Sequence, residues 1–269
     1  MSTPVATVIV PTFDHGATIE LTVASALRQT MPVEVLIIGD GVPDSHKVYM
    51  EQLVRGDARV RFLDHPKDPR RGEPYRHEAL TQARGHIVCY LCDRDLWFPT
   101  HVERLATMLE TADFAHSLPM HLHPGGLWQF FPVDLAHPVH RQLMLTHWNR
   151  VPLSCAAHTL SAYQRLPEGW SPTPAGTATD WHMFRKFLLD PQCRCASGAV
   201  PTALTFPSPP RKGWTMAQRV EELQGWKALI DNTATNTALM MRFMELAIQA
   251  RDRELAGYYG EQFFPAAPP

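Results

Sequence analysis

Short apolar runs alternate with segments of helical periodicity through the first 112 residues, and this alternation restricts the fold more than any other feature of the sequence. The apolar runs have the length and composition of β-strands. They are VATVIV (5–10), VEVLIIGDG (33–41), VRFL (60–63) and HIVCYLC (86–92). Segments with apolar residues at helical spacing lie at 18–30, 47–56, 74–85 and 100–112. This order predicts an α/β fold, in which helices flank a mostly parallel sheet.

Three polar segments follow strands of this predicted sheet. They are PTFDHG (11–16), GDGVPD (39–44) and CDRDLW (92–97). In open α/β sheets, ligands bind outside the carboxyl ends of the strands. We therefore expect these three segments to meet at one ligand site.

The pattern changes after about residue 113. Strand-like runs lie at 113–118, 120–123 and 127–133, and a helix is predicted at 180–189. A Pro-rich passage follows at 200–214, and two further helices are predicted at about 216–231 and 236–256. No linker divides the chain. We expect one globule, with a domain over 1–200 that has halves at 1–112 and 113–200, and a loop with C-terminal helices over 201–269.

Charge and composition exclude several classes of protein. The formal net charge is −2 and no block of Lys and Arg marks a nucleic-acid surface. No apolar run is long enough to span a membrane. The N-terminus lacks a basic region, and the cysteine count of five is odd, so we expect no secretion signal and reduced thiols in a cytoplasmic protein. A peripheral place at the inner membrane face stays open.

The stretch CDRDLWFP (92–99) places Asp93 and Asp95 two residues apart at the end of a predicted strand. In an extended chain, side chains at i and i+2 point the same way, so both carboxylates would face one point and Arg94 would turn away. Oxygen ligands in this arrangement suit Mg²⁺ or Mn²⁺. The alternative is that these acids only form a turn or pair with Arg94.

Together the motifs resemble family 2 of the inverting, nucleotide-sugar-dependent glycosyltransferases. The resemblance rests on VIVPTFDHGATIELTVASALRQT (8–30), EVLIIGDGVPD (34–44), RRGEPYRHEALTQARGHIVCYLCDRDLWFPTHVERL (70–105) and TATDWHMFRKFL (177–188). The first three stretches keep the family's order and spacing, whereas the C-terminal third matches loosely. The resemblance implies a GT-A fold with a Rossmann-like mixed sheet, a nucleotide-sugar half at 1–112, an acceptor half at 113–200 and an acceptor-side extension that ends in helices.

The resemblance also implies which residues bind the nucleotide. The turn Pro11-Thr12-Phe13 would line the nucleotide pocket, and Asp40 would contact the base or ribose. Arg76 would reach the uracil or the diphosphate. The alternatives are a turn role for Asp40 beside Gly41, and a surface cation near Glu78 for Arg76. The family often has a second acid before Asp40, where this chain has Gly39.

The metal motif of the family fits this sequence with departures. Aligned on Trp97 and Pro99, usual acidic positions fall at Cys92 and Arg94, while Asp95 matches the last acid. The resemblance implies Asp95 as the main ligand of Mn²⁺ or Mg²⁺. Asp93 is expected to help hold the metal and to face the nucleotide ribose.

Asp180 is at the start of a predicted helix and matches the acidic residue that serves as the catalytic base in the family. The resemblance implies that it takes the proton of an acceptor hydroxyl, although Asp at a helix start also serves as a cap. Arg211 and Lys212 would close over the phosphates or lie in a solvated loop, and His158 is a candidate acceptor contact. The donor is expected to be a UDP-sugar. The acceptor is a saccharide, a lipid-linked glycan or another hydroxyl compound.

Two rival functions stay open on the sequence. Gly39, Cys92 and Arg94 each replace an acid usual in the family, which favours a catalytically impaired nucleotide-binding relative. His121 and His123 lie two apart on a predicted strand, and a zinc hydrolase centred on them is the other rival. Cys89 and Cys92 are interpreted as core thiols, because positions i and i+3 of a strand face opposite ways.

Overall fold

The computed structural model describes residues 3–146 and 149–263. Its strands are β1 (Ala6–Thr12), β2 (Val33–Asp40), β3 (Val60–His65), β4 (Ile87–Tyr90), β5 (Leu96–Trp97), β6 (Phe114–His116), β7 (Met120–His123), β8 (Leu127–Phe130), β9 (Ala156–Thr159), β10 (Cys195–Ser197) and β11 (Ala203–Leu204). Its α-helices are α1 (Thr18–Leu27), α2 (Asp44–Gly56), α3 (Glu73–Thr81), α4 (His101–Leu109), α5 (Pro138–Thr146), α6 (Leu160–Arg165), α7 (Thr179–Leu189), α8 (Met216–Asp231) and α9 (Thr233–Phe263).

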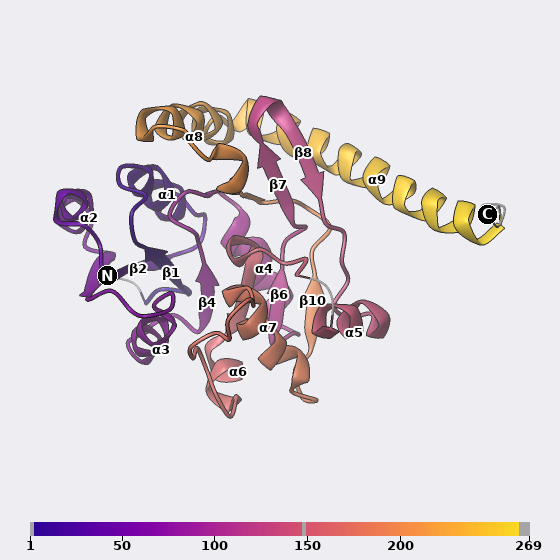
Figure 1. Cartoon of the computed structure of the whole chain (residues 1–269), viewed down its shortest axis with the longest axis horizontal. Coiled ribbons are helices and arrows are strands. Elements are labelled where there is room, and N and C mark those ends of the chain that lie inside the picture. The colour runs from indigo at the N-terminus through magenta and orange to yellow at the C-terminus, as the bar shows by residue number, and fades with distance from the viewer. Residues whose placement is uncertain (1–2, 147–148, 264–269) are drawn as a thin grey trace.

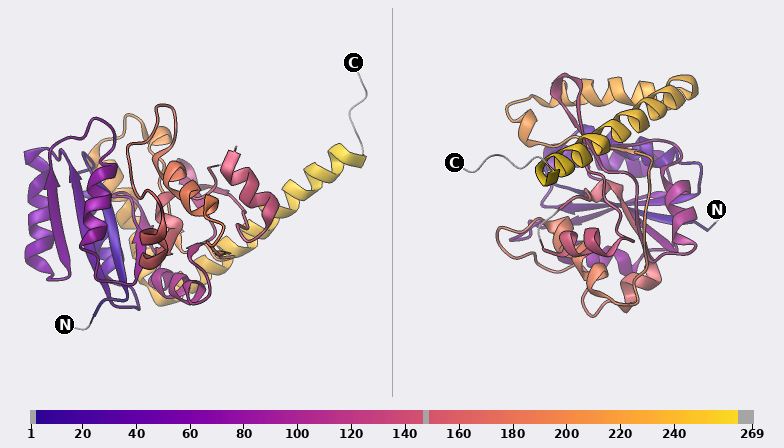
Figure 2. Two further views of the ribbon diagram at one scale, coloured as in Figure 1. Left: turned by 90° about the horizontal axis from the view of Figure 1, so that it is seen from below. Right: turned by 90° about the vertical axis from the view of Figure 1, so that its right-hand side faces the viewer.

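Seven strands of the described chain form one mixed sheet in the order β10-β6-β9-β4-β1-β2-β3. The four N-terminal strands run parallel, as their apolar runs predicted, and the residues of β2 are all buried. Helices of the first half lie on both sides of these strands (Figure 2). A strand covered on both faces needs a continuous apolar run rather than an alternating one, and VLII (35–38) provides it.

β9 was not predicted from the sequence. It lies antiparallel between β4 and β6 and so joins the two halves of the sheet. Its residues AAHT are few, and they carry neither an alternating pattern nor a β-branched run, so nothing local marks them as a strand. Its position comes from pairing with strands far away in the sequence.

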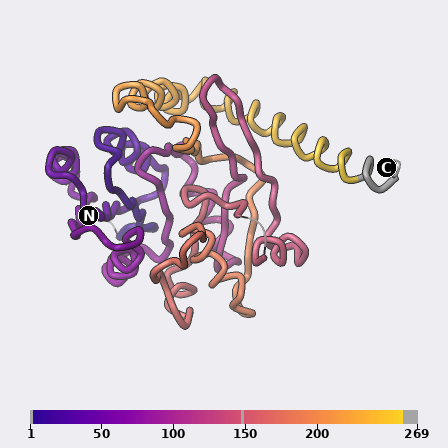
Figure 3. The backbone as a smooth tube through the Cα atoms, viewed as in Figure 1, coloured from indigo at the N-terminus to yellow at the C-terminus, as the bar shows by residue number. Residues whose placement is uncertain are grey.

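The C-terminal segment returns to the first half before it leaves the body. α8 packs against α1, and β11 pairs with β5. A second apolar cluster joins Phe98 to Phe206 and to Phe243 of α9. From there α9 projects away from the rest of the molecule (Figures 1 and 3). The segment beyond residue 200 therefore shares a core with the end of β5.

Candidate functional site

A polar cleft of about 360 Å³ lies at the carboxyl ends of β1, β2 and β4. This is the edge of the sheet where the sequence placed its three polar segments. The lining includes seven of the residues expected in the site: Pro11, Thr12, Phe13, Asp40, Arg76, Asp93 and Asp180. It also includes Asp14, His15, Lys67, Arg71, Cys92, Arg94, Leu153, Trp170, Ala178 and Thr179.

Asp93 faces this cleft between two nitrogen groups. Its Oδ2 lies 3.3 Å from Nδ1 of His15, and its Oδ1 lies 3.5 Å from Nη1 of Arg94. Burial by itself would raise the pKa of Asp93, but the hydrogen bond of His15 and the charges of His15 and Arg94 lower it overall. Asp93 is therefore an ionised carboxylate whose two oxygens both lie close to positively charged or hydrogen-bonding nitrogens.

Asp95 does not share the direction of Asp93, and the expectation that the two carboxylates face one point is wrong. The chain turns after Cys92, where the N–H of Asp95 donates to the carbonyl of Cys92, so the segment is not extended. Oδ1 of Asp95 accepts from the N–H of Phe206 (2.8 Å), and Oδ2 accepts from the hydroxyl of Ser154 (2.5 Å). Arg94 is not turned away, because it lines the cleft.

The turn at 92–95 is fixed from the other side by α1. The hydroxyl of Thr18 donates to the carbonyl of Asp93 (2.8 Å), and that of Thr22 donates to the carbonyl of Asp95 (3.0 Å). Asp95 and both threonines are buried. Asp95 thus holds the turn to Ser154 and Phe206, with one hydrogen bond to each of its carboxylate oxygens.

Asp40 lies at the end of β2 and is held by the loop that follows β3. Its carboxylate pairs with the ammonium of Lys67 and accepts the backbone N–H of Asp68 at 2.7 Å. Gly72 has a φ of +69°, and a Cβ there would lie 3.1 Å from Cβ of Asp40, so the backbone before α3 passes close to the acid. Lys67 also lies over the exposed ring of Phe13, 5.2 Å from its centroid.

Arg76 is buried at the wall of the cleft with donors that no described residue accepts. It is 7 % exposed, and its Nε and Nη1 have no hydrogen-bond partner within residues 3–146 and 149–263. Its Cζ lies 5.0 Å from the ring centroid of Trp170. Buried polar groups are normally hydrogen-bonded, so two unpaired guanidinium donors indicate an anionic partner that enters the cleft.

A buried hydrogen-bond chain fixes Trp170 behind Arg76. Nδ1 of His158 lies 2.9 Å from the carbonyl of Thr159 and therefore carries the proton, which leaves Nε2 as an acceptor. The hydroxyl of Tyr90 then donates to Nε2 (2.8 Å) and accepts the indole N–H of Trp170 (2.9 Å). Each of these hydrogen bonds has a defined donor and acceptor, so the indole ring of Trp170 is held in one orientation.

Asp180 lies in the first turn of α7 and borders the same cleft. Its Oδ1 accepts the N–H of Trp181 (2.8 Å) and the side-chain amide of Asn149 (3.1 Å). Burial is the largest influence and raises the pKa of Asp180 above its ordinary value. A fixed carboxylate with a raised pKa has the properties of a general base.

Sequence comparison assigns the family of this chain. Residues 7–166, which are more than half of the 269, match the model of glycosyl transferase family 2. The chain belongs to glycosyl transferase family 2. The family expected from the motifs is thereby confirmed.

Relatives and solved structures agree with this family and fold. The uncharacterized glycosyltransferase EpsJ of Bacillus subtilis (strain 168) is 27 % identical over 108 residues, which are 40 % of this chain and 31 % of EpsJ. S. aureus TarS 1–349 in complex with UDP-GlcNAc has a TM-score of 0.59 at 15 % identity, over 84 % of this chain and 66 % of that one. The mannosyltransferase PcManGT of Pyrobaculum calidifontis, in complex with GDP-Man and Mn²⁺, has a TM-score of 0.54 at 16 % identity, over 98 % and 82 %.

These likenesses confirm the mixed α/β sheet of the GT-A type that the sequence predicted. The chain spans about a third of the length of EpsJ, and 39 % of the full TarS chain. No helix of the described part is long and apolar enough to cross a bilayer.

Several residues expected in the family 2 site lie elsewhere. Arg211 is 1 % exposed and forms two bonds of 2.6 Å to the carboxylate of Glu222, so it anchors α8. Lys212, next to it, is exposed and does not border the cleft in the described structure. His158 is fully buried in the chain behind Trp170 and has both ring nitrogens engaged. We leave these three residues out of the proposed site.

The histidine and cysteine candidates show no metal site. Within the described ranges, no group of three or more His, Cys, Asp or Glu side chains is arranged to hold a metal ion. The rings of His121 and His123 lie 6.2 Å apart without a third such ligand in that part of the chain. Cys89 and Cys92 are free, and burial raises the pKa of the Cys89 thiol to about 12.

The family resemblance implied a metal ion held by Asp95 and Asp93. Asp95 uses both oxygens to hold the turn, and Asp93 already faces His15 and Arg94. Mg²⁺ and Mn²⁺ prefer carboxylate oxygens and are repelled by a neighbouring guanidinium. The residues present do not fit the expected metal site.

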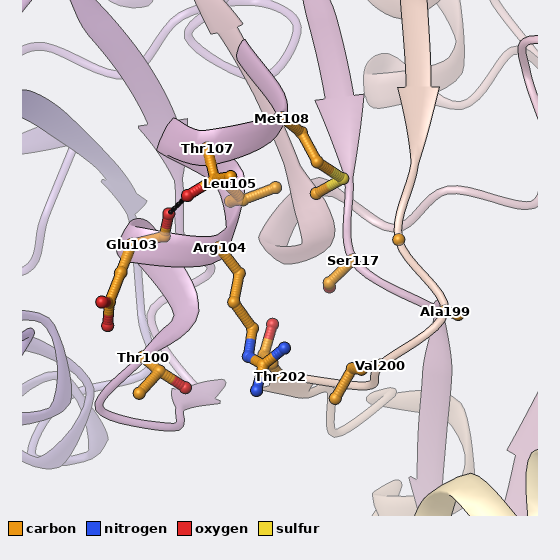
Figure 4. Close-up of a pocket in the computed structure, with 11 residues that line it drawn as sticks. Thr100, Glu103, Arg104, Leu105, Thr107, Met108, Ser117, Ala199, Val200 and Thr202 are labelled. Carbon is orange, nitrogen blue, oxygen red and sulfur yellow. Dashed lines mark hydrogen bonds between the residues drawn. The ribbon is translucent and has the colours of Figure 1, made fainter. Parts of the chain in front are cut away.

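A second cavity of about 400 Å³ lies between α4 and the segment around Thr202 (Figure 4). Arg104 points into it, and Glu103 on its rim accepts a hydrogen bond from Thr30. None of the predicted site residues lines this cavity in the described structure. It lacks the converging carboxylates and cations of the cleft, so we do not propose it as the binding site of a nucleotide-sugar.

Residues that the sequence reasoning missed complete the cleft. His15 lies in the segment PTFDHG, which was expected at the site, although no role was given to it. Lys67 and Arg71 come from the basic segment HPKDPRRG (65–72) at the end of β3. Its position after a strand of the sheet could have identified it as part of the site. Trp170 was expected only as one of several tryptophans that could stack on a sugar, and its place beside Arg76 is given by the tertiary structure.

Proposed function

We propose that this protein is an inverting glycosyltransferase that moves a sugar from a nucleotide-sugar, with UDP as the expected nucleotide, to an acceptor hydroxyl. One observation carries the proposal. Asp40, Arg76 and Asp180 come from three distant parts of the chain and line one cleft at the carboxyl edge of a GT-A sheet. Membership of glycosyl transferase family 2 supports the same reaction class.

The cleft has a separate group for each part of the donor. Phe13 and Asp40 lie at the ends of β1 and β2, where a base and ribose would bind. Asp93 would face the ribose. The unpaired donors of Arg76 would bind the diphosphate, because a guanidinium hydrogen-bonds phosphate oxygens in defined directions.

Asp180 would act as the base in a single displacement. The acceptor oxygen attacks the anomeric carbon, and its proton passes to the carboxylate of Asp180. The bond from the anomeric carbon to the diphosphate oxygen breaks on the opposite side, and the electron pair leaves with the diphosphate. The configuration at the anomeric carbon is therefore inverted. A positioned base contributes about 10²–10⁴-fold to such a step.

The acceptor is proposed only as a class. A saccharide, a lipid-linked glycan or another hydroxyl compound would place its hydroxyl beside Asp180. We propose a cytoplasmic location, where nucleotide-sugars are formed.

The direct test measures donor binding and transfer together. Purified protein is titrated with UDP and GDP by calorimetry, and hydrolysis of UDP-sugars and GDP-sugars is followed by release of the nucleoside diphosphate. We expect one nucleotide to bind and its sugar to be hydrolysed slowly without an acceptor. Binding without any turnover would favour the catalytically impaired relative, and absence of both would refute the proposed function.

A further inference from the structure

We propose that the guanidinium groups of Arg94 and Arg76 bind and neutralise the donor diphosphate, in place of a divalent cation. This inference rests on the proposed function. It follows from the disagreement between the expected metal site and the donors that the cleft contains. It predicts a glycosyl transferase family 2 protein whose nucleotide binding does not depend on Mg²⁺ or Mn²⁺.

The two acids expected to hold a metal are both engaged within the protein. A metal on the diphosphate needs a carboxylate that is free to coordinate it. Asp95 is buried, its oxygens are directed at Ser154 and Phe206, and it does not line the cleft in the described structure. Of the two acids expected to hold the metal, only Asp93 lines the cleft in the described structure, and both of its oxygens already face a nitrogen.

A positive charge lies beside Asp93. Arg94 occupies the centre of the turn, and its Nη1 lies 3.5 Å from Oδ1 of Asp93 and 3.5 Å from Nε2 of His15. Its Nε donates to the carbonyl of Phe206 at 3.3 Å, which fixes the stem of the side chain. The guanidinium therefore stays at the place where a dication bound to Asp93 would lie, and it brings the positive charge itself.

A second guanidinium, that of Arg76, lies on the wall of the same cleft. It is buried and stacked on Trp170, so its charge is held in place before any ligand enters. Its two unpaired donors have no carboxylate in hydrogen-bond contact among the described residues. Burial of a cation with unpaired donors raises the free energy of the folded protein unless an anion accepts its hydrogen bonds. A diphosphate supplies several oxygens that can do so.

Two fixed guanidinium groups would perform the chemical task of the metal. As the bond between the anomeric carbon and the diphosphate oxygen breaks, the leaving group gains negative charge. Preorganised positive groups that face this charge stabilise the transition state without any proton transfer. Neither arginine changes its protonation state, so the step balances with Asp180 as the only proton acceptor.

The experiment is a calorimetric titration of UDP and GDP, each with excess EDTA and with excess MnCl₂. We expect the Kd of the bound nucleotide to agree within about twofold between the two conditions, since no metal contributes to binding. Arg94→Ala should weaken binding by about 10-fold to 100-fold in both conditions, as for the loss of charged hydrogen bonds. Arg94→Lys, which keeps the charge, should recover part of the loss.

Arg104→Ala is the matched control, because it removes the same side chain from the second cavity and should leave the Kd unchanged. The inference is overturned if Mn²⁺ tightens nucleotide binding by about tenfold or more and Asp93→Asn removes that gain. It is equally overturned if both Arg94 variants bind like the wild type. If neither nucleotide binds in any condition, the proposed function itself fails, so the two failures are distinguishable.

Discussion

The guanidinium of Arg76 lies over the indole of Trp170, with 5.0 Å between Cζ and the ring centroid. Trp170 is in turn held by the hydroxyl of Tyr90, which is fixed by His158. Burial lowers the pKa of His158 to about 4, so the imidazole stays neutral near pH 7 and keeps its acceptor nitrogen. A buried chain thus determines where a cation of the cleft lies.

Tyr90→Phe should weaken binding of the nucleoside diphosphate by about threefold to tenfold. The indole N–H of Trp170 loses its acceptor in this variant, so the ring on which Arg76 lies is less well fixed. Binding of the free nucleoside should change little, since Arg76 is proposed to contact the diphosphate. Calorimetry of UDP and uridine measures both. Tyr49→Phe removes the same hydroxyl from α2 and is the control.

A double-mutant cycle separates this positioning role from a general loss of packing. If Tyr90 acts through Trp170, then Tyr90→Phe should add almost nothing to the binding defect of Trp170→Phe. Full additivity of the two defects would show that Tyr90 acts by another route.

Asp180→Asn should lower the transfer rate by about 10²–10⁴-fold, because the amide cannot accept the acceptor proton. The Kd for the nucleoside diphosphate should stay within about twofold, since Asp180 is proposed to contact the acceptor and not the nucleotide. Rate assays and calorimetry on one preparation test both parts. The mutant Asp190→Asn, at the end of the same helix, should retain full activity.

The pH dependence of kcat/KM should report the raised pKa of Asp180. A base works only when it is ionised, so kcat/KM should rise with pH through this pKa and then level off. The midpoint should lie above the ordinary Asp value of about 3.9. Asp93 has a lowered pKa and stays ionised across this range, so it adds no step. A midpoint at or below the ordinary value contradicts Asp180 as the base.

The same shift has a consequence for stability. A carboxyl whose pKa is higher in the folded state makes the fold less stable as pH rises from the unfolded pKa through the folded pKa. Asp180→Asn removes this effect and keeps an oxygen for Trp181 and Asn149. We therefore expect its Tm at pH 7 to be no lower than that of the wild type, and the difference to shrink in acid.

Ser154→Ala should lower the free energy of unfolding by about 1–3 kcal/mol, because Oδ2 of Asp95 loses its buried donor. Denaturant unfolding measures the change. Ser161→Ala removes an exposed hydroxyl with a bond of 3.2 Å to Thr159, and it should cost at most about 0.5 kcal/mol. Equal losses in both variants would show that the contact to Asp95 contributes little.

The sequence predicted the N-terminal strands and the edge of the sheet at which the cleft lies. Apolar runs such as VLII mark buried strands locally, and parallel strands bring their carboxyl ends together. Asp40 and Asp93 could therefore be assigned to one edge without knowledge of the side-chain contacts. Family motifs added Arg76 and Asp180, which no local pattern marks.

The orientation of Asp95 and the role of Trp170 could not be obtained in this way. The side chain of Asp95 is directed by Phe206, which is 111 residues away in the sequence, and by Ser154, which is 59 residues away. Trp170 reaches the cleft through Tyr90, 80 residues away. A spacing rule such as i, i+2 describes an extended chain, and it fails where distant hydrogen bonds impose a turn.

The bond from the N–H of Phe206 to Asp95 also means that the N-terminal half of the chain takes a hydrogen-bond donor from the C-terminal segment. The segment that follows residue 200 supplies a main-chain donor to the interior of a turn formed more than a hundred residues earlier. A fragment that ends before Phe206 leaves a buried carboxylate short of a partner beside the donor cleft. We therefore expect such a fragment to bind nucleotide more weakly than the whole chain.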